Sequence, residues 1–364
     1  MIGVYIHIPY CRTICPYCDF VKRPTKGVVP DEFIRALCGE IAAYDGPRNA
    51  DSVFFGGGTP SLIEPRDLET VLAAVRRHFA LSDNTEITLE ANPDDITGEL
   101  VRRWTNLGVN RVSLGVQSFN EDALRYLGRR HDADGARRAC AIVGRHFVNW
   151  NIDLIFGAPP YGAWRATLEE TTRMGSTHVS AYGLTYEAGT PFGKRAEEAI
   201  DEDLYLEQYA VTLEMLNGFD RYEVSNYAKP GRESVHNLHY WRNEEYAGFG
   251  PGAYSFVNGV RARNHAKLED YLDKPGEKSE SLPLSDEEVR VETVIQHLRL
   301  REGISRSAYR ARFDRELDAD FAEPVRALSA RDLLADDGET LRPTRRGFEL
   351  NNEIGLALVS AGVL

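Results

Sequence analysis

The sequence predicts an α/β protein, a partial (β/α)6 barrel of the TIM type followed by a small, mainly helical domain. Three observations predict this fold. Strand-like and helix-like segments alternate six times over the first two-thirds of the chain, as expected for parallel strands joined by crossover helices. The strand-like segments are apolar at nearly every residue, which is typical of strands covered on both faces. Glycine, polar or cysteine residues end every strand, at the edge where a β/α barrel carries its site.

The predicted elements follow one another regularly. All six strands end in glycine, polar or cysteine residues. This favours a barrel over an open doubly wound sheet, which binds its ligands near one switch point. The expected strands are 3–8, 52–55, 86–90, 111–116, 151–156 and 178–184, and the expected helices are 31–44, 65–80, 97–106, 120–127 with 134–147, 164–174 and 201–218.

The last third of the chain predicts a change of organisation. Residues 218–270 are rich in Tyr, Asn, Gly and His and indicate loops and short strands, and 273–288 has the composition of a linker. Helical patterns with one strand-like run, 340–344, then predict a winged-helix-like accessory domain. We therefore expect a barrel domain over residues 1–272 and a C-terminal domain over 285–364.

Composition narrows the function classes. The 364 residues are 42% hydrophobic and carry a formal net charge of -13. This negative charge argues against binding of nucleic acid or of an anionic membrane through a broad basic surface. No apolar stretch has the length of a membrane span. Five cysteines without a signal peptide indicate a reducing compartment, and we expect a cytoplasmic location.

Three cysteines directly after the first strand are the most informative motif. Cys11, Cys15 and Cys18 have the spacing C-x3-C-x2-C. A structural zinc site and a fully protein-ligated iron–sulfur cluster each need four protein ligands, and this motif supplies three. A [4Fe–4S] cluster held by three cysteines leaves one iron free for the amine and carboxylate of a molecule such as S-adenosylmethionine. A zinc site needs a fourth ligand, and both Cys38 and Cys140 lie on apolar helical faces, where we expect core thiols.

Further candidates lie at the other strand ends. The glycine triplet lets the backbone turn sharply and approach a ligand closely, although a tight turn alone would use the same residues. Glu90 is suited to bind ribose hydroxyls; the alternative is a solvated loop carboxylate. The set that could hold a nucleoside with its charged amino acid comprises Gly56, Gly57, Gly58, Thr59, Glu90, Gln117, Arg129 and Asp153.

A second candidate cluster is separate from the first. The segment 235–241 reads VHNLHYW and precedes a glycine-rich run. Histidines beside aromatic rings could bind a flat macrocycle, with imidazole on a haem iron and rings stacked on the porphyrin. A structural role for each histidine is the alternative.

Taken in order, these motifs resemble a known family. CRTICPYCDF, FFGGGTPS, LEANPDD, RVSLGVQSF, IDLIFG and HNLHYW with the following GPGA are similar to the radical S-adenosylmethionine proteins related to oxygen-independent coproporphyrinogen dehydrogenase, and most similar to the haem chaperone branch. The resemblance spans about residues 1–270, with 285–364 as the looser C-terminal domain.

The resemblance implies a function and its residues. It implies that Cys11, Cys15 and Cys18 ligate a [4Fe–4S] cluster and that Tyr5 and the strand-end set contact S-adenosylmethionine. It associates the HNxxYW motif with haem, hence His236, Tyr240 and Trp241, with His239 at a variable position. The implied activity is delivery of haem to apo-haemoproteins, with an electron donor such as a flavodoxin or ferredoxin. Whether a homodimer forms stays open.

Two features separate the chaperone from the dehydrogenase. The dehydrogenases carry a further cysteine two residues after the third, where this chain has Phe20. They also extend upstream of the first strand, which here begins at residue 3. Both features favour the chaperone, with coproporphyrinogen III decarboxylation as the alternative. One departure from the family pattern is the loop GAPPYGAW, where Pro159 and Pro160 replace a GLPGQT-like turn and stiffen the backbone.

Overall fold

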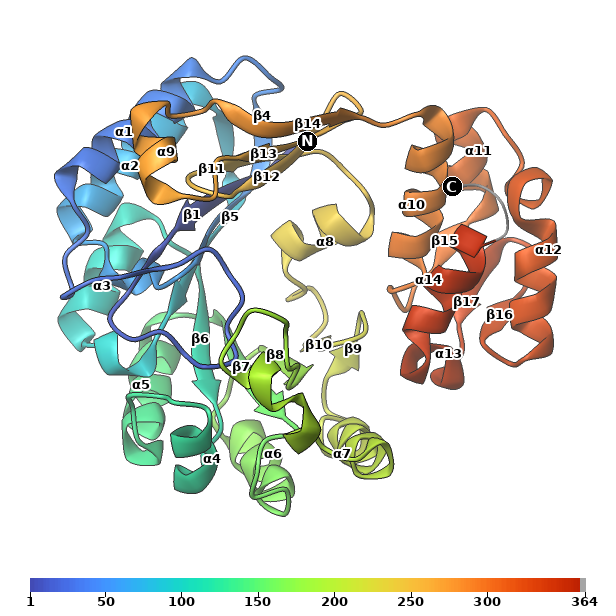
Figure 1. Ribbon diagram of the computed structural model, residues 1–364, viewed down its shortest axis with the longest axis horizontal. Helices are drawn as coiled ribbons and strands as arrows, with labels where there is room; N and C mark the ends of the chain where they lie inside the picture. Colours follow the sequence, from blue (N-terminus) through green and yellow to red (C-terminus); the bar gives the residue numbers. More distant parts are fainter. Residues whose placement is uncertain (361–364) are drawn as a thin grey trace.

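A single twelve-stranded sheet forms the barrel wall in the computed structural model, which describes residues 1–360 (Figure 1). Its centre is the parallel run β1-β4-β5-β6-β7-β8, and additional strands extend both edges, so the barrel is open. The predicted partial (β/α)6 barrel is therefore confirmed. The six central strands are β1 (Ile2–Ile8), β4 (Asn49–Gly57), β5 (Ala80–Ala91), β6 (Arg111–Gln117), β7 (Asn149–Phe156) and β8 (His178–Gly183).

The edges of the sheet come from the region expected to hold loops and short strands. On one side β11 pairs parallel with β1, and β12, β13 and β14 follow antiparallel. On the other side β10 pairs antiparallel with β8 and then with β9. The bounds are β9 (Asp220–Arg221), β10 (Asn226–Ala228), β11 (Tyr246–Phe249), β12 (Tyr254–Val257), β13 (Val260–Asn264) and β14 (Lys278–Pro283). The expected linker 273–288 thus contributes an edge strand to the barrel sheet.

Helices cover the outer face of the central strands (Figure 1). Their ends follow local chemistry: in α3 the Thr97 side chain accepts a hydrogen bond from the Leu100 backbone, and Gly108 ends the helix with φ +91°. The bounds are α1 (Asp31–Ala43), α2 (Pro65–His78), α3 (Gly98–Leu107), α4 (Glu121–Tyr126), α5 (Ala133–His146), α6 (Ala163–Arg173) and α7 (Glu202–Met215), with short 3-10 helices at Pro60–Leu62, Pro93–Asp95 and Phe192–Glu198.

The two faces of the central strands differ in polarity. Outward residues such as Val4, Phe55 and Leu89 are fully buried in the core between sheet and helices. The inward positions are less apolar than we expected, and the reason is that they line a polar interior instead of a second hydrophobic layer. Inward-facing buried polar residues include Ser52, Glu86, Arg111, Ser113, Asn151 and His178.

Two short helices were not expected between residues 218 and 273. Helix α8 (Val235–Trp241) begins after Ser234, whose side chain accepts from the Asn237 backbone, and it buries His236 and His239. Because the buried face is made of histidines, the hydrophobic pattern carried no helical signal. A further short helix, α9 (Leu268–Asp273), precedes the edge strand β14.

The C-terminal region packs around a hydrophobic core of its own. Its helices surround a three-stranded sheet, as in a winged helix, and Ser285 and Glu288 form a capping box at its start. Residues 361–364 of the expected domain lie outside the described residues. The elements are α10 (Asp286–His297), β15 (Ile304–Ser305), α11 (Arg306–Phe313), α12 (Leu317–Ala330), β16 (Leu334–Asp336), β17 (Thr340–Pro343), α13 (Arg345–Glu349) and α14 (Asn351–Ser360).

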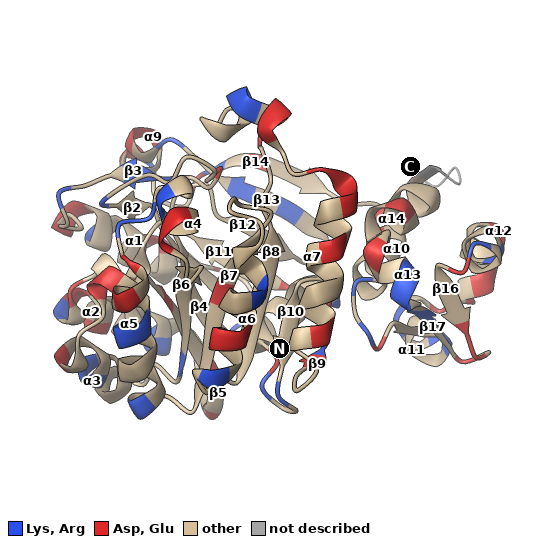
Figure 2. Cartoon of the chain, turned by 90° about the horizontal axis from the view of Figure 1, so that it is seen from below, with Lys and Arg blue, Asp and Glu red and all other residues tan. Residues whose placement is uncertain are grey.

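Charged residues are scattered over the outside of the molecule. In Figure 2, residues of both signs occur on the outer helices taken together and on the C-terminal helices, whereas α7 carries acidic residues without lysine or arginine. No helix among residues 1–360 has the length and hydropathy that a membrane span requires.

Candidate functional site: a cysteine loop and a polar barrel interior

The three cysteines lie on one loop at the carboxyl end of β1. Cys11 belongs to the two-residue strand β2 (Tyr10–Cys11), which pairs with β3 (Arg23–Pro24) and so closes the base of the loop. Within the loop the Cys18 backbone N–H donates to the Cys15 carbonyl at 3.2 Å. All three thiols are free, and burial raises the pKa of both Cys11 and Cys18.

A chain of polar contacts joins this loop to the neighbouring strand ends. Arg129 Nη1 lies 3.4 Å from Cys15 Sγ, and Nη2 donates to Asn92 Oδ1 at 2.5 Å and to the Gly115 carbonyl at 3.0 Å. Asn92 in turn donates to Thr59 Oγ1 at 3.2 Å. The structure therefore brings Thr59 and Arg129, both predicted from the sequence, together with the cysteine loop.

The donor set of the loop suits an iron–sulfur cluster. Within residues 1–360 no three His, Cys, Asp or Glu side chains converge on a point that would hold a single metal ion. A cubane binds each cysteine through a different iron, so its ligands surround a volume rather than a point. Three free thiols on one loop, with the Arg129 guanidinium beside them to offset thiolate charge, fit such a group.

The glycine triplet lies at the end of β4, beside the end of β1, with which β4 pairs in parallel. A Cβ on Gly58 would stand 2.7 Å from the Pro9 backbone, and one on Gly57, with φ +112°, would stand 2.5 Å from the His7 ring. Both backbone N–H groups are already used: Gly57 donates to Glu90 Oε2 at 3.1 Å and Gly58 to the Ile8 carbonyl at 2.7 Å. The triplet therefore acts through its small size.

Two carboxylates face the barrel interior above these glycines. Asp153 accepts from Ser113 Oγ at 2.9 Å and from Asn151 Nδ2 at 2.7 Å. Within the described part of the chain Glu90 accepts a hydrogen bond from the Gly57 backbone alone, so burial, with the neighbouring Asp153 charge, raises the pKa of Glu90 to about 8. Burial likewise raises the pKa of Asp153. Both residues are only partly buried by surface area, because they face the open mouth of the barrel.

Gln117 ends β6 in an unusual backbone conformation. Its φ is +66°, in the left-handed region that non-glycine residues seldom adopt, and the register of β6 with β7 shifts just before it. Strain of this kind is concentrated at ligand sites. Its amide Nε2 lies beside Gly115, whose carbonyl holds Arg129. Gln117 and Arg129 thus share the β6 end of the site.

The expected haem residues lie at the opposite, amino end of the strands. His236 is 1% exposed, its Nδ1 lies 2.9 Å from Ser52 Oγ, and its Nε2 lies 2.9 Å from Tyr240 OH. Burial lowers the pKa of His236 to about 3. Trp241 faces the C-terminal region, where Arg299 stacks on its ring at 4.5 Å. Both ring nitrogens of His236 are therefore engaged, and Trp241 does not share a surface with it.

Tyr5 lies between the two regions. Its ring stacks on His236 with centroids 6.1 Å apart, and its hydroxyl lies 3.0 Å from His7 Nδ1. His7 Nε2 donates to the Val21 carbonyl at 2.8 Å, in the loop that follows the cysteines. Burial lowers the pKa of His7 to about 4, so the ring is neutral.

Some residues of the site were missed by sequence reasoning. Asn92 and Tyr17, which both contact Arg129, and His7 occupy central positions. The sequence signal for Asn92 was its place at the end of the third strand, and the signal for His7 was its alternation with Tyr5 along the first strand. Neither signal distinguishes a site residue from a structural one.

Family models match both parts of the chain. Residues 5–170 match the radical SAM superfamily, and residues 284–350 match the HemN C-terminal domain. The solved structure of coproporphyrinogen III oxidase (HemN) from Escherichia coli, described as a radical SAM enzyme, superposes with a TM-score of 0.85 over 98% of this chain and 89% of that chain at 21% identity. This likeness concerns the fold.

Curated relatives match over most of the chain. The heme chaperone HemW of Lactococcus lactis is 33% identical over 97% of this chain and 96% of its own length. HemW of Escherichia coli is 38% identical over 70% of each chain. Radical S-adenosyl methionine domain-containing protein 1, mitochondrial, of Bos taurus is 34% identical over 98% of this chain and 87% of its own length. The chain therefore belongs to the HemW-like family of radical S-adenosylmethionine proteins.

Proposed function

We propose that this protein is a haem chaperone that carries a [4Fe–4S] cluster on Cys11, Cys15 and Cys18 and binds S-adenosylmethionine. The observation that carries the proposal is the loop of three free thiols joined through Arg129, Asn92 and Thr59 to the strand ends, in a chain similar along its length to HemW proteins. When bound, the cluster would supply an electron to the sulfonium of S-adenosylmethionine.

The proposed nucleotide site follows from the charges around the barrel mouth. Glu90 and Asp153 would face the cationic and hydroxyl groups of the ligand, and Arg129 would face its carboxylate beside the cluster. The glycines would allow close approach of the ligand to the backbone. The proposed contacts are Tyr5, Gly56, Gly57, Gly58, Thr59, Glu90, Gln117, Arg129 and Asp153.

Haem binding is proposed for the motif on α8. His236, Tyr240 and Trp241 are the family-derived candidates. Because Nε2 of His236 is hydrogen bonded to the Tyr240 hydroxyl, ligation of haem iron by His236 requires that hydroxyl to release the ring nitrogen. Tyr240 is therefore part of the proposed haem site through His236.

The alternative function is oxidative decarboxylation of coproporphyrinogen III. The side chain of Phe20 is 64% exposed beside the cysteine loop, at the position where the dehydrogenases have a further cysteine. The likeness to HemN supports a shared fold and not this activity. We therefore place the chaperone function first.

The proposal includes partners and a location. Haem and apo-haemoproteins are the expected partners, and a flavodoxin or ferredoxin is the expected electron donor. Five free cysteines suit a reducing compartment such as the cytoplasm. Size-exclusion chromatography of the same purified protein tests whether it forms a homodimer.

Anaerobic reconstitution with iron and sulfide, followed by separate titrations with S-adenosylmethionine and haem, tests the proposal. We expect about four irons per chain, saturable binding of both ligands and no turnover of coproporphyrinogen III. His236→Ala should weaken haem binding without loss of iron, whereas the exposed His146→Ala on α5 should change neither. Coproporphyrinogen decarboxylation would reverse the ranking of the two functions, and unchanged haem binding by His236→Ala would remove that residue from the site.

A further inference from the structure

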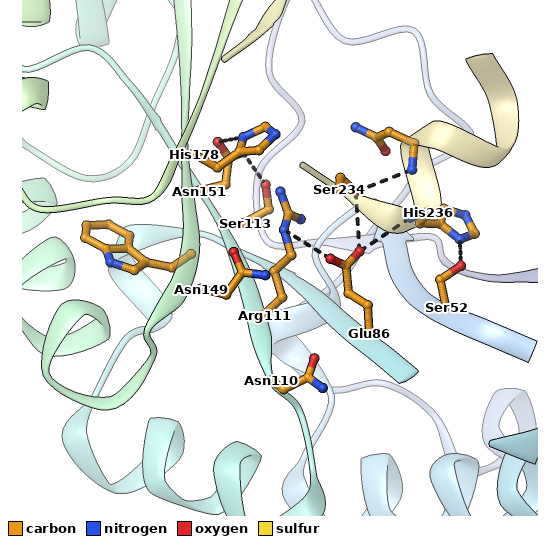
Figure 3. Close-up of polar contacts among 12 residues, drawn as sticks. Ser52, Glu86, Asn110, Arg111, Ser113, Asn149, Asn151, His178, Ser234 and His236 are labelled. Carbon is orange, nitrogen blue, oxygen red and sulfur yellow. Dashed lines mark hydrogen bonds and ion pairs between the residues drawn. The ribbon is translucent and has the colours of Figure 1, made fainter. Parts of the chain in front are cut away.

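Arg111 is a buried cation at the centre of the barrel. It is the first residue of β6 and is 2% exposed, and its side chain points into the interior together with Glu86, Ser113 and Asn151 (Figure 3). A charge removed from water in this way costs several kcal/mol unless partners offset it. Its partners therefore need to be identified.

Its nearest partner is held loosely. Nε of Arg111 lies 3.8 Å from Glu86 Oε2, which is an ion pair without a hydrogen bond, and among residues 1–360 Nε has no hydrogen-bond partner. A well-formed arginine–carboxylate pair has N–O distances of about 2.7–2.9 Å. Glu86 also accepts at long range, from Ser234 Oγ at 3.5 Å and from the His236 backbone at 3.4 Å. Glu86 alone does not account for a cation at this place.

Strand register places Arg111 below the two carboxylates of the proposed nucleotide site. Arg111 is in register with Thr88, which lies between Glu86 and Glu90 on the inner face of β5. Two residues further along β6, Ser113 is in register with Glu90 and donates to Asp153. The guanidinium therefore lies between the lower carboxylate and the upper pair, and its positive charge favours the ionised form of Glu90 and Asp153.

The neighbouring histidines do not supply a second positive charge. His178 Nδ1 donates to Asn151 Oδ1 at 2.7 Å, which leaves its Nε2 to accept from Tyr222 OH at 3.0 Å, so the ring is neutral. Burial lowers the pKa of His178 and of His236 well below the ordinary value. Arg129 lies at the rim, bonded to Asn92. The fixed counter-charge beneath the carboxylates is Arg111.

We infer that Arg111 is a positioning residue for S-adenosylmethionine: it is the buried counter-charge that favours ionisation of Glu90 and Asp153 and so strengthens the negative charge that this pair offers to a cationic ligand. This inference rests on the proposed function. It predicts that Arg111 acts on ligand affinity through the carboxylates and not through contact with the ligand. The titratable groups facing this interior are Tyr5 and His7 of β1, Glu86 and Glu90 of β5, Asp153 of β7, His178 and Tyr182 of β8, His236 and Tyr240 of α8, and Tyr222 with the buried Glu223 beside it.

Equilibrium dialysis of S-adenosylmethionine against the reconstituted full chain tests the inference, from about pH 6.5 to about pH 9.5. Arg111→Met should weaken binding about tenfold near neutral pH, because loss of a nearby opposite charge raises a carboxyl pKa by about one unit or more. The difference in affinity between Arg111→Met and the unaltered protein should disappear at the alkaline end of this pH range, where Glu90 is ionised even without the Arg111 charge. Arg111→Lys keeps the charge and should keep the profile of the unaltered protein.

A double variant separates this role from a structural one. Glu86→Met with Arg111→Met removes the loose pair together, an exchange that buried ion pairs often tolerate. Arg111 is in register with Thr88, the inward residue of β5 between Glu86 and Glu90, so Arg111 lies nearer to Glu90 than Glu86 does. Removal of both charges should therefore still move the pH midpoint of ligand binding to a higher value. An unchanged midpoint in the double variant, or in a folded Arg111→Met, overturns the inference. Absence of binding by the unaltered protein at every pH would instead refute the proposed function.

Discussion

At the residue scale, the end of β4 depends on the absence of a side chain at one position. Gly57 has φ +112°, and a Cβ there would stand 2.5 Å from His7 Cε1. The His7 ring cannot move aside easily, because Tyr5 and the Val21 carbonyl hold its two nitrogens. Two costs therefore coincide at Gly57, backbone strain and a clash with a fixed ring.

Gly57→Ala should lower the free energy of unfolding by more than about 2 kcal/mol, since left-handed backbone costs about 1–2 kcal/mol and overpacking adds to it. The matched control is Gly175→Ala, where φ is +78° and nothing lies within 4 Å, so that it carries the strain alone. Urea denaturation measures the difference. Equal losses in the two variants would contradict a tight fit between Gly57 and His7.

At the element scale, α8 is anchored to the barrel by a charged histidine. His239 Nε2 lies 2.6 Å from Asp51 Oδ1 of β4, and Nδ1 lies 3.1 Å from Glu244 Oε2. Burial alone would lower the pKa of His239, but these two carboxylates raise it to about 9. The two histidines of α8 therefore carry different charges at neutral pH.

A pH dependence of stability follows from the raised pKa of His239. The group is protonated more readily in the folded than in the unfolded chain, so its contribution is complete below about pH 6.5 and is lost as the pH rises through about 9. His239→Gln should flatten the fall in unfolding free energy across this window, and His146→Gln on the exposed end of α5 should not. Urea titrations at a series of pH values measure both slopes; identical slopes for His239→Gln and the unaltered protein would contradict the anchor.

At the scale of the whole molecule, the C-terminal region holds α8 from the side opposite the barrel. Arg312 of α11 donates to the backbone carbonyls of Arg242 and Asn243 at the end of α8, at 3.0 and 2.6 Å. Asn243 also donates to Thr293 of α10 at 3.0 Å. The helix that carries the proposed haem residues is therefore clamped by polar contacts between the barrel and the C-terminal helices α10 and α11.

Arg312→Ala should loosen this clamp by about 1–2 kcal/mol, towards the low end for charge-assisted hydrogen bonds because the residue is exposed to solvent. Hydrogen exchange of α8 should become faster while exchange in the central strands stays unchanged. Arg310→Ala on the same helix removes only the exposed pair with Glu316 and is the control. Unchanged protection of α8 in Arg312→Ala would contradict the clamp.

The order of the six central strands and their helices could be predicted from the chain because each unit carries its own local signal. Apolar runs mark the outward faces of the six central strands, and capping residues such as Thr97 mark helix ends. The cysteine spacing and the glycine triplet could likewise be found locally. By contrast, α8 buries histidines instead of a hydrophobic stripe, and the strand β14 is exposed along its length, so neither follows a periodic pattern.

What the sequence by itself determined is the parallel β/α order and the family, and it predicted a site at the carboxyl strand ends. These follow from patterns within a few residues and from the order of the motifs. Only the tertiary structure decided which groups meet: Asn92 between Thr59 and Arg129, both nitrogens of His236 engaged, and Arg111 beneath Glu90 and Asp153. The physical reason is that strand register and burial, which act between residues far apart in the chain, set these contacts and charges.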